Sequence, residues 1–320
     1  MKKRVFITGI SGFAGSHLAQ HLLSQNIYEV SGTFLSESSL ENLREIEDKL
    51  NLEKVDLTNR KRIEVLIGSK KPQLVFHLAA LASPAYSFEY PAETITNNIA
   101  IQINILEAIR KANLKSCRIL IVSSADVYGA VTKKDLPIDE ETPFRPTNPY
   151  AVSKITQDFL GLQYFFSYNL SIVRVRSFNH IGPRQSADFV VSSFAKKIAE
   201  IEKGKKEPVL AVGNLEAKRD LTDVRDIVKA YSLIAKKGKI GDAYNLGSGV
   251  SYKIADILEW LLSFSKKKIK VVSDPSLFRP VDTPELLCDN RKIRKAIDWK
   301  PTISIAETLK DTLDYWRNIV

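Results

Sequence analysis

Cysteine and histidine are scarce in this chain of 320 residues, which has two cysteines and four histidines. Cys117 and Cys288 lie far apart in the sequence and show none of the close spacings typical of a zinc site. His17 and His21 stand four residues apart, which suits a metal ion, but the other two histidines belong to other motifs and provide no third ligand. We therefore expect reduced thiols and no metal site.

Long apolar runs are also missing. No stretch approaches the roughly 18 apolar residues of a membrane span. The basic start at residues 1–4 is followed by an apolar run too short for a signal peptide. A composition of 44% hydrophobic and 26% charged residues is typical of a globular protein. The sequence predicts a cytoplasmic protein with no membrane partner.

Acidic residues are fewer than basic ones, 37 against 47, giving a formal net charge of +10. Such a surplus can indicate a nucleic-acid partner. Residues 1–177 have 21 basic and 18 acidic residues, whereas residues 178–320 have 26 and 19, so most of the surplus lies in the second part. The lysine runs there have no interleaved aromatic residues to stack on bases. We therefore expect an anionic small molecule as partner and no nucleic acid.

Short apolar runs alternate with amphipathic segments through the first half of the chain. The runs predict strands at residues 5–8, 28–34, 52–56, 74–78, 118–123 and 172–178. Helical spacing of apolar residues predicts helices at residues 16–23, 61–68 and 94–112. This alternation indicates an α/β fold, a Rossmann-type doubly wound parallel sheet. The later segments predict a smaller α/β substrate-binding domain.

A glycine-rich segment follows the first predicted strand and opens the first predicted helix. Gly9, Gly12 and Gly15 have the spacing G-x-x-G-x-x-G. Glycines allow a tight turn and a close approach of the backbone to a pyrophosphate, and the helix N-terminus offers N–H groups and a positive dipole end. The segment, with Phe13 and Ala14, therefore predicts a dinucleotide-binding site.

The end of the second predicted strand bears on the choice of dinucleotide. Residues 32–36 lack the acidic residue that usually binds the ribose 2′-hydroxyl of NAD, and they also lack the arginine typical of NADP sites. Without a carboxylate to repel a 2′-phosphate, the sequence favours NADP(H) slightly over NAD(H). Asp56 and Leu57 end the third predicted strand, where an acidic side chain commonly faces adenine; a loop cap is the alternative role for Asp56.

A tyrosine and a lysine form the candidate catalytic pair. Tyr150 and Lys154 are four residues apart in a helical pattern and therefore share one helix face. A nearby ammonium stabilises phenolate, so we expect Lys154 to lower the pKa of Tyr150 toward the working pH. Ser124, at the end of the fifth predicted strand, is positioned to hydrogen-bond a substrate carbonyl or alcohol. We predict Ser124, Tyr150 and Lys154 as the catalytic residues.

Together with residues 77–80 and Asn98, these motifs resemble the extended short-chain dehydrogenase/reductase family over essentially the whole chain. The resemblance implies that hydride moves to or from the nicotinamide C4 while the tyrosine donates or accepts the proton. It also implies a set of further cofactor-binding residues: Leu78, Ala79, Ala80, Asn98, Tyr150 and Lys154.

Within that family, residues 177–191 and 212–220 are similar to the GDP-mannose branch, and more to its 4-keto reductases than to its 4,6-dehydratases. Leu221 and Thr222 stand where the dehydratases have a Trp-Gly pair, and Asp126 stands where they have a glutamate base. Arg184, in contrast, is the residue that the dehydratases often have at this position. The resemblance implies reduction of GDP-4-keto-6-deoxy-D-mannose to GDP-D-rhamnose by NADPH or NADH. A GDP-mannose 4,6-dehydratase or a sugar-nucleotide 4-epimerase is the alternative. A non-catalytic nucleotide- or RNA-binding relative is a more remote one.

The resemblance also implies the substrate side, since arginines bind diphosphates bidentately. The implied substrate-binding residues are Ser124, Asp126, Asn179, Arg219, Arg279 and Asp282. Residues 1–177 and about 218–247 would form the NAD(P)-binding domain, and about 178–217 and 248–320 the sugar-nucleotide-binding domain. The family often forms homodimers through the helices at about 95–112 and 150–168, and we expect the same here.

Overall fold

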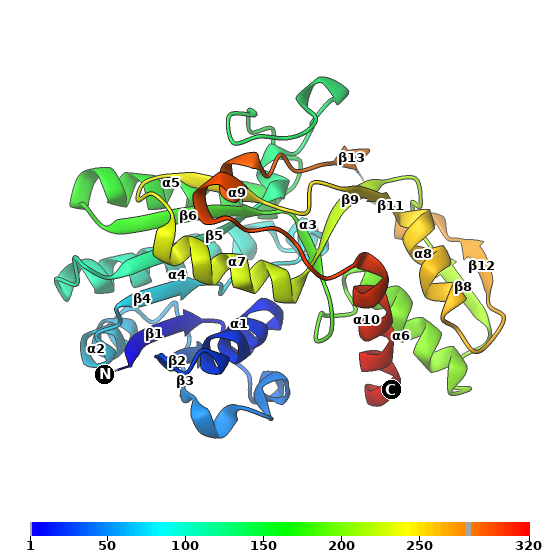
Figure 1. Cartoon of the computed structure of the whole chain (residues 1–320), viewed down its shortest axis with the longest axis horizontal. Coiled ribbons are helices and arrows are strands. Elements are labelled where there is room, and N and C mark those ends of the chain that lie inside the picture. Colours follow the sequence, from blue (N-terminus) through cyan, green and yellow to red (C-terminus); the bar gives the residue numbers. More distant parts are fainter. Residues whose placement is uncertain (1, 279–282) are drawn as a thin grey trace.

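A seven-stranded sheet forms the larger part of the molecule, at the left of Figure 1. The structure, a computed structural model, describes residues 2–278 and 283–320. The strand order is β10-β6-β5-β4-β1-β2-β3, and every pairing in this sheet is parallel. The strands are β1 (Lys3–Thr8), β2 (Tyr28–Phe34), β3 (Asn51–Lys54), β4 (Leu74–His77), β5 (Arg118–Ser124), β6 (Ser171–Ser177) and β10 (Ala243–Leu246). The predicted doubly wound parallel sheet is confirmed.

Helices cover both faces of this sheet. One face carries α1 (Phe13–Ser24), α7 (Val224–Lys237) and α9 (Arg291–Ile297), and the other carries α2 (Arg60–Lys70), α4 (Pro91–Lys111) and α5 (Pro149–Tyr168). Successive side chains of β1 point to opposite faces. Val5 and Ile7 therefore join the core under α1 and α7, while Phe6 joins the core under α2 and α4. Burial on both faces explains why these strands are continuous apolar runs.

The smaller part lies at the right of Figure 1, and its described residues form two short sheets and three α-helices. Its core contains Phe194, Ile198, Leu258 and Leu313. Its strands are β7 (Asn179–Ile181), β9 (Lys218–Asp223), β11 (Ser251–Lys253) and β13 (Glu285–Leu286) in one sheet, and β8 (Val209–Val212) and β12 (Lys270–Ser273) in the other. Its helices are α6 (Val190–Glu202), α8 (Ile254–Ser263) and α10 (Ile305–Ile319).

Shorter helical elements complete the chain. They are α3 (Pro84–Glu89) and the 3-10 helices η1 (Glu37–Leu43), η2 (Glu47–Lys49), η3 (Ala125–Tyr128), η4 (Lys133–Asp135) and η5 (Pro275–Leu277). Among the described helices, none has both the length and the apolar character needed to cross a membrane.

Two elements lie on the other side of the domain borders expected from the sequence. Strand β9 pairs with β7, β11 and β13 of the smaller part, whereas residues 218–223 were expected in the larger one. Helix α9 packs on α7 and β10, because Ile293 and Ile297 complete the core of the larger part. We therefore propose that the second segment of the larger domain begins at about residue 224, and that α9 also belongs to the larger domain.

Candidate active site

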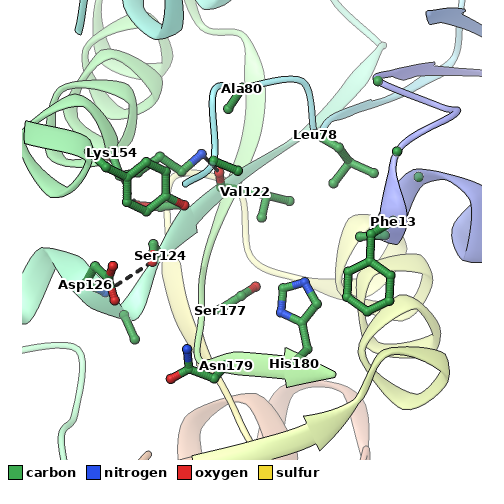
Figure 2. A pocket seen from close by; sticks show the side chains of 18 of the residues that line it. Phe13, Leu78, Ala80, Val122, Ser124, Asp126, Lys154, Ser177, Asn179 and His180 are labelled. Carbon is green, nitrogen blue, oxygen red and sulfur yellow. Dashed lines mark hydrogen bonds between the residues drawn. The ribbon is translucent and has the colours of Figure 1, made fainter. Parts of the chain in front are cut away.

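A cavity of about 320 Å³ lies at the carboxyl ends of β1, β4, β5 and β6 (Figure 2). In open parallel sheets, the crevice at this edge is the usual ligand site. The structure brings most of the predicted residues together here. The predicted residues that line the cavity are Gly9, Gly12, Phe13, Ala14, Gly15, Leu78, Ala79, Ala80, Ser124, Asp126, Tyr150, Lys154 and Asn179.

The glycine loop has a backbone conformation and close contacts that favour glycine. Gly9 has a φ of +68°, and a Cβ on Gly15 would lie 2.2 Å from the carbonyl oxygen of Gly9. Gly12 caps the N-terminus of α1 without a side-chain hydrogen bond, and the first turn carries no acidic residue. The N–H groups of this helix end therefore remain available to an anion in the cavity. These residues fit a dinucleotide.

Thr8, the last residue of β1, ties the glycine loop to the loop after β4. Its Oγ1 accepts hydrogen bonds from the N–H groups of Leu78 and Ala79, both at 3.1 Å, and lies 2.9 Å from Nδ1 of His77. Burial lowers the pKa of His77 to about 3, so the ring is neutral. On the other side of the ring, Nε2 of Gln157 lies 3.4 Å from Nε2 of His77. No local pattern in the sequence marks Thr8, since only the folded sheet shows its partners.

Helix α5 brings the predicted catalytic pair, Tyr150 and Lys154, to the cavity. The helix begins after Asn148, whose side chain accepts a hydrogen bond from the Ala151 N–H group at 2.7 Å. The Lys154 ammonium lies 5.9 Å from the centre of the Tyr150 ring. It donates hydrogen bonds to the Val122 carbonyl oxygen at 2.6 Å and to Gln157 Oε1 at 3.0 Å. The pair therefore shares one helix face, as the spacing predicts.

Ser124 at the end of β5 and Asp126 in η3 lie side by side (Figure 2), and both line the same cavity as Tyr150. Ser124 Oγ accepts a hydrogen bond from the Asp126 N–H group at 3.1 Å, which fixes the start of η3. The hydroxyl hydrogen is not used in this bond. Ser124 lines the cavity, and its hydroxyl hydrogen can be donated to Tyr150, with which Ser124 is hydrogen-bonded, or to a substrate oxygen.

The pKa of Tyr150 moves in the direction opposite to the sequence expectation. Burial and the charge of Asp126 raise the pKa of Tyr150, and a hydrogen bond with Ser124 only partly offsets them. Burial lowers the pKa of Lys154 to about 8, with Asp158 acting against that shift. At neutral pH the phenol is therefore protonated and the ammonium is charged. A protonated phenol is the form that can give a proton to a substrate oxygen.

Three predicted cofactor residues do not line this cavity. Asn98 is buried on α4, where its side chain bonds both the N–H and the carbonyl of Leu81 and donates to Ser153 Oγ at 3.0 Å. It thus connects the loop after β4 to α5, behind the cavity. The Asp56 carboxylate accepts hydrogen bonds from the N–H and hydroxyl groups of Thr58, as in a loop cap, and Leu57 packs in the core beside α2. Their cofactor roles stay predictions.

A second cavity of about 520 Å³ adjoins the first. The two share four lining residues: Asn179, His180, Gln185 and Phe189. Arg219 on β9 lines the second cavity and donates to the Thr283 carbonyl oxygen at 2.7 Å. Asp126, Asn179 and Arg219 also line a third cavity of about 90 Å³, which shares lining residues with each of the first two. The predicted Arg279 and Asp282 lie outside the described residues.

Aromatic stacking joins the two parts of the molecule beside the glycine loop. The rings of Phe13 and His180 lie 5.7 Å apart and nearly parallel, with an interplanar angle of 9° (Figure 2). His17 on α1 donates through Nε2 to the Pro183 carbonyl oxygen at 2.9 Å. No group of three His, Cys, Asp or Glu side chains among the described residues is arranged to hold a metal ion.

A sequence model of the family described as GDP-mannose 4,6 dehydratase matches residues 6–312. The chain belongs to this family. One relative is GDP-6-deoxy-D-mannose reductase from Pseudomonas aeruginosa, which is 32% identical over 100% of this chain and 99% of that protein. GDP-mannose 4,6-dehydratase from Vibrio cholerae is 29% identical over 96% of this chain and 92% of that protein.

Solved structures of this fold are also similar. RMD from Pseudomonas aeruginosa complexed with NADPH has a TM-score of 0.86 at 31% identity and covers 100% of both chains. UDP-glucose 4-epimerase from Thermotoga maritima with UDP-glucose has a TM-score of 0.89 at 27% identity over 99% of both chains. The predicted membership of the extended short-chain dehydrogenase/reductases is confirmed.

Proposed function

We propose that this chain reduces the 4-keto group of GDP-4-keto-6-deoxy-D-mannose to GDP-D-rhamnose, with NADPH or NADH as the reductant. The observation that carries this proposal is one cavity that joins the glycine loop to Ser124, Tyr150 and Lys154 and continues into a second cavity. The Pseudomonas relative that spans the full length supports the choice of reaction, and its structure with NADPH supports the cofactor.

The chain's own residues account for the proton chemistry. The nicotinamide supplies the hydride when it is bound. Ser124 is placed to hydrogen-bond the keto oxygen, and Tyr150, held protonated by its raised pKa, gives its proton to that oxygen. Lys154, anchored on Val122 and Gln157, stabilises the phenolate that remains.

The dinucleotide would lie along the glycine loop, with its pyrophosphate at the N-terminus of α1 and Leu78, Ala79 and Ala80 beside it. The residues that follow the end of β2 are consistent with a slight preference for NADP(H). Glu37, the first carboxylate beyond that strand, pairs with Lys54 at 3.0 Å, so its charge is compensated. The hydroxyls of Ser11 and Ser39 lie 2.6 Å apart in the same region.

A 4,6-dehydratase is the second candidate, and Asp126 is the observation that favours it. Its carboxylate lines the cavity near enough to Tyr150 to raise the tyrosine pKa. A shortened carboxylate at this position retains the capacity to act as a base.

Two incubations separate the candidates. With GDP-4-keto-6-deoxy-D-mannose, we expect loss of NADPH or NADH absorbance and formation of a GDP-6-deoxyhexose, whose C4 configuration is read by NMR. With GDP-mannose and no reductant, we expect no reaction. Formation of the keto sugar from GDP-mannose would establish the dehydratase instead, and inactivity in both incubations would refute both assignments.

The assembly and location are also proposed. Val152, Phe159 and Phe166 lie exposed at seven-residue intervals along α5, so they form an apolar stripe on one side of this helix. A homodimer through α4 and α5 would cover this stripe. A reducing cytoplasmic location fits the two buried free cysteines. The absence of a nucleic-acid partner stays a prediction.

A further inference from the structure

Lys197 lies on α6 in the second cavity, away from the catalytic residues. Phe189, just before α6, lines the first, second and third cavities, whereas Lys197 lines only the second. Eight residues along a helix amount to about 12 Å at 1.5 Å per residue. Arg219 lines both the second and third cavities and is therefore near their junction. The second cavity therefore includes both Arg219 and Lys197, so a diphosphate at Arg219 would leave Lys197 for another part of the nucleotide.

The walls of the second cavity suit a flat aromatic base. Phe194 of α6, Leu215 and Leu277 line it with apolar side chains. Phe278 also lines it while remaining 51% exposed, and Leu277 is 47% exposed. Large apolar side chains left open to water at the rim of a cavity are typical of a ligand site.

The Lys197 ammonium has few partners in the part of the chain that the structure describes. Its hydrogen bond to the Ala211 carbonyl oxygen is long, at 3.4 Å, and no carboxylate of the described residues pairs with it within 4 Å. Hydrogen bonds from Ser276, and to a smaller extent the charge of Lys197, lower the pKa of Asp274. The neighbouring Lys196 differs, because it pairs with Glu200 and lies over the Trp316 ring. Lys197 therefore has donors to offer a ligand.

We propose that Lys197 recognises the nucleotide base of the substrate and makes the site selective for guanine. Guanine presents two adjacent acceptors, O6 and N7, to a cationic donor, whereas adenine presents its N6 amino donor beside N7 and repels it. Uracil offers the single acceptor O4 on a smaller ring. The inference rests on the proposed function, because it takes the second cavity as the nucleotide site.

Binding of GDP, ADP and UDP, measured by titration calorimetry on the full chain, tests this role without any turnover. The wild type should bind GDP more tightly than ADP and UDP. Lys197→Met should weaken GDP by about 5- to 150-fold, the range of one good cation–guanine contact. ADP binding should change by less than about twofold, so the preference for GDP is lost. The matched control, Lys196→Met, should leave all three affinities unchanged.

Equal weakening of all three nucleotides by Lys197→Met would overturn the proposal, because it would assign Lys197 to the diphosphate. Unchanged GDP binding, or no preference for GDP in the wild type, would overturn it too. Thermal unfolding checks that the variant is folded, and Lys197→Gln replaces it if it is not. GDP selectivity that depends on Lys197 in a protein without reductase activity would refute only the proposed reaction. Active reduction with unaltered selectivity in the variant would refute only the role of Lys197.

Discussion

Lys154 and Tyr150 occupy one face of α5, with the ammonium 5.9 Å from the centre of the phenol ring. The lysine is held by the Val122 carbonyl oxygen and by Gln157, so it is fixed before any ligand arrives. Because the tyrosine is protonated and the lysine is charged at neutral pH, the pair is prepared to release a proton. This arrangement is the basis of the first two predictions.

Tyr150→Phe should remove the proton donor and retain the buried ring. We expect kcat to fall by about 10²- to 10⁴-fold, the usual contribution of a positioned acid. GDP affinity, measured by calorimetry, should stay within about twofold. Undiminished turnover of the keto sugar would show that another group provides the proton.

The pH dependence should follow Lys154. Its pKa is lowered to about 8, so the residue is charged below that pH and neutral above it. We therefore expect kcat/KM to fall as the pH rises through about 8. Lys154→Arg keeps its charge over this range, so whatever activity it retains should show no such decline. A wild-type profile that stays flat to pH 9.5 would contradict the assignment.

Gly15 and Gly68 should respond to alanine in opposite directions. A Cβ on Gly15 would lie 2.2 Å from the Gly9 carbonyl oxygen and 2.9 Å from Ile10 Cα, and both are backbone atoms. Gly15→Ala should destabilise by about 1–3 kcal/mol or more and abolish NADPH binding. A Cβ on Gly68, inside α2, meets nothing within 4 Å, so Gly68→Ala should stabilise by about 0.5–1 kcal/mol.

Urea unfolding and NADPH titration measure both effects. If Gly15→Ala binds NADPH normally, the loop can move aside to admit the Cβ. That result would refute the proposed contact between this loop and the pyrophosphate.

Acid should destabilise the fold through His17. Burial lowers the pKa of His17 to about 4, well below its ordinary value of 6.5. Between these two pH values the unfolded chain takes up a proton that the native state does not, so the free energy of unfolding decreases as the pH falls. The loss amounts to about 3 kcal/mol at 1.36 kcal/mol per pKa unit.

Chemical denaturation at pH 7 and pH 4.5 measures this loss. His17→Gln should make the free energy of unfolding less dependent on pH, while His21→Gln, a half-buried position on the same helix, should have a smaller effect. Equal pH dependence in the wild type and His17→Gln would contradict the prediction.

The apolar stripe on α5 predicts a sensitive interface. Phe166 is 71% exposed in the single chain, so a lysine there costs little in the monomer. Phe166→Lys should weaken the dimer by tenfold or more in sedimentation equilibrium, because it buries a charge in the interface. Ile319→Lys, at an exposed apolar position on α10, should leave the dimer unchanged. A monomeric wild type would refute the homodimer.

The sequence was most informative where chemistry depends on neighbours along the chain. The glycine spacing placed the turn before α1, and the spacing of Tyr150 and Lys154 placed both on one face of α5, since a helix repeats every 3.6 residues. Six strands of the large sheet were predicted within a few residues, because strands buried on both faces are continuous apolar runs.

Local sequence patterns do not reveal a property that depends on contacts between distant segments. The direction of the Tyr150 pKa shift is set by burial and by Asp126, both of which outweigh the neighbour four residues away. Asn98 bonds Leu81 and Ser153, which no local pattern reveals. Helix α9 is amphipathic by sequence, but which core it completes depends on the path of the chain.

The sequence by itself determined the α/β fold, the glycine loop and the Ser124, Tyr150 and Lys154 set, because each is encoded within one strand, turn or helix. Only the tertiary structure decided that β9 belongs to the smaller sheet, that a second cavity adjoins the first at Phe189, and that Lys197 lines that second cavity. A cavity is bounded by segments that meet only when the chain folds, so its lining cannot be found from the spacing of residues along the sequence.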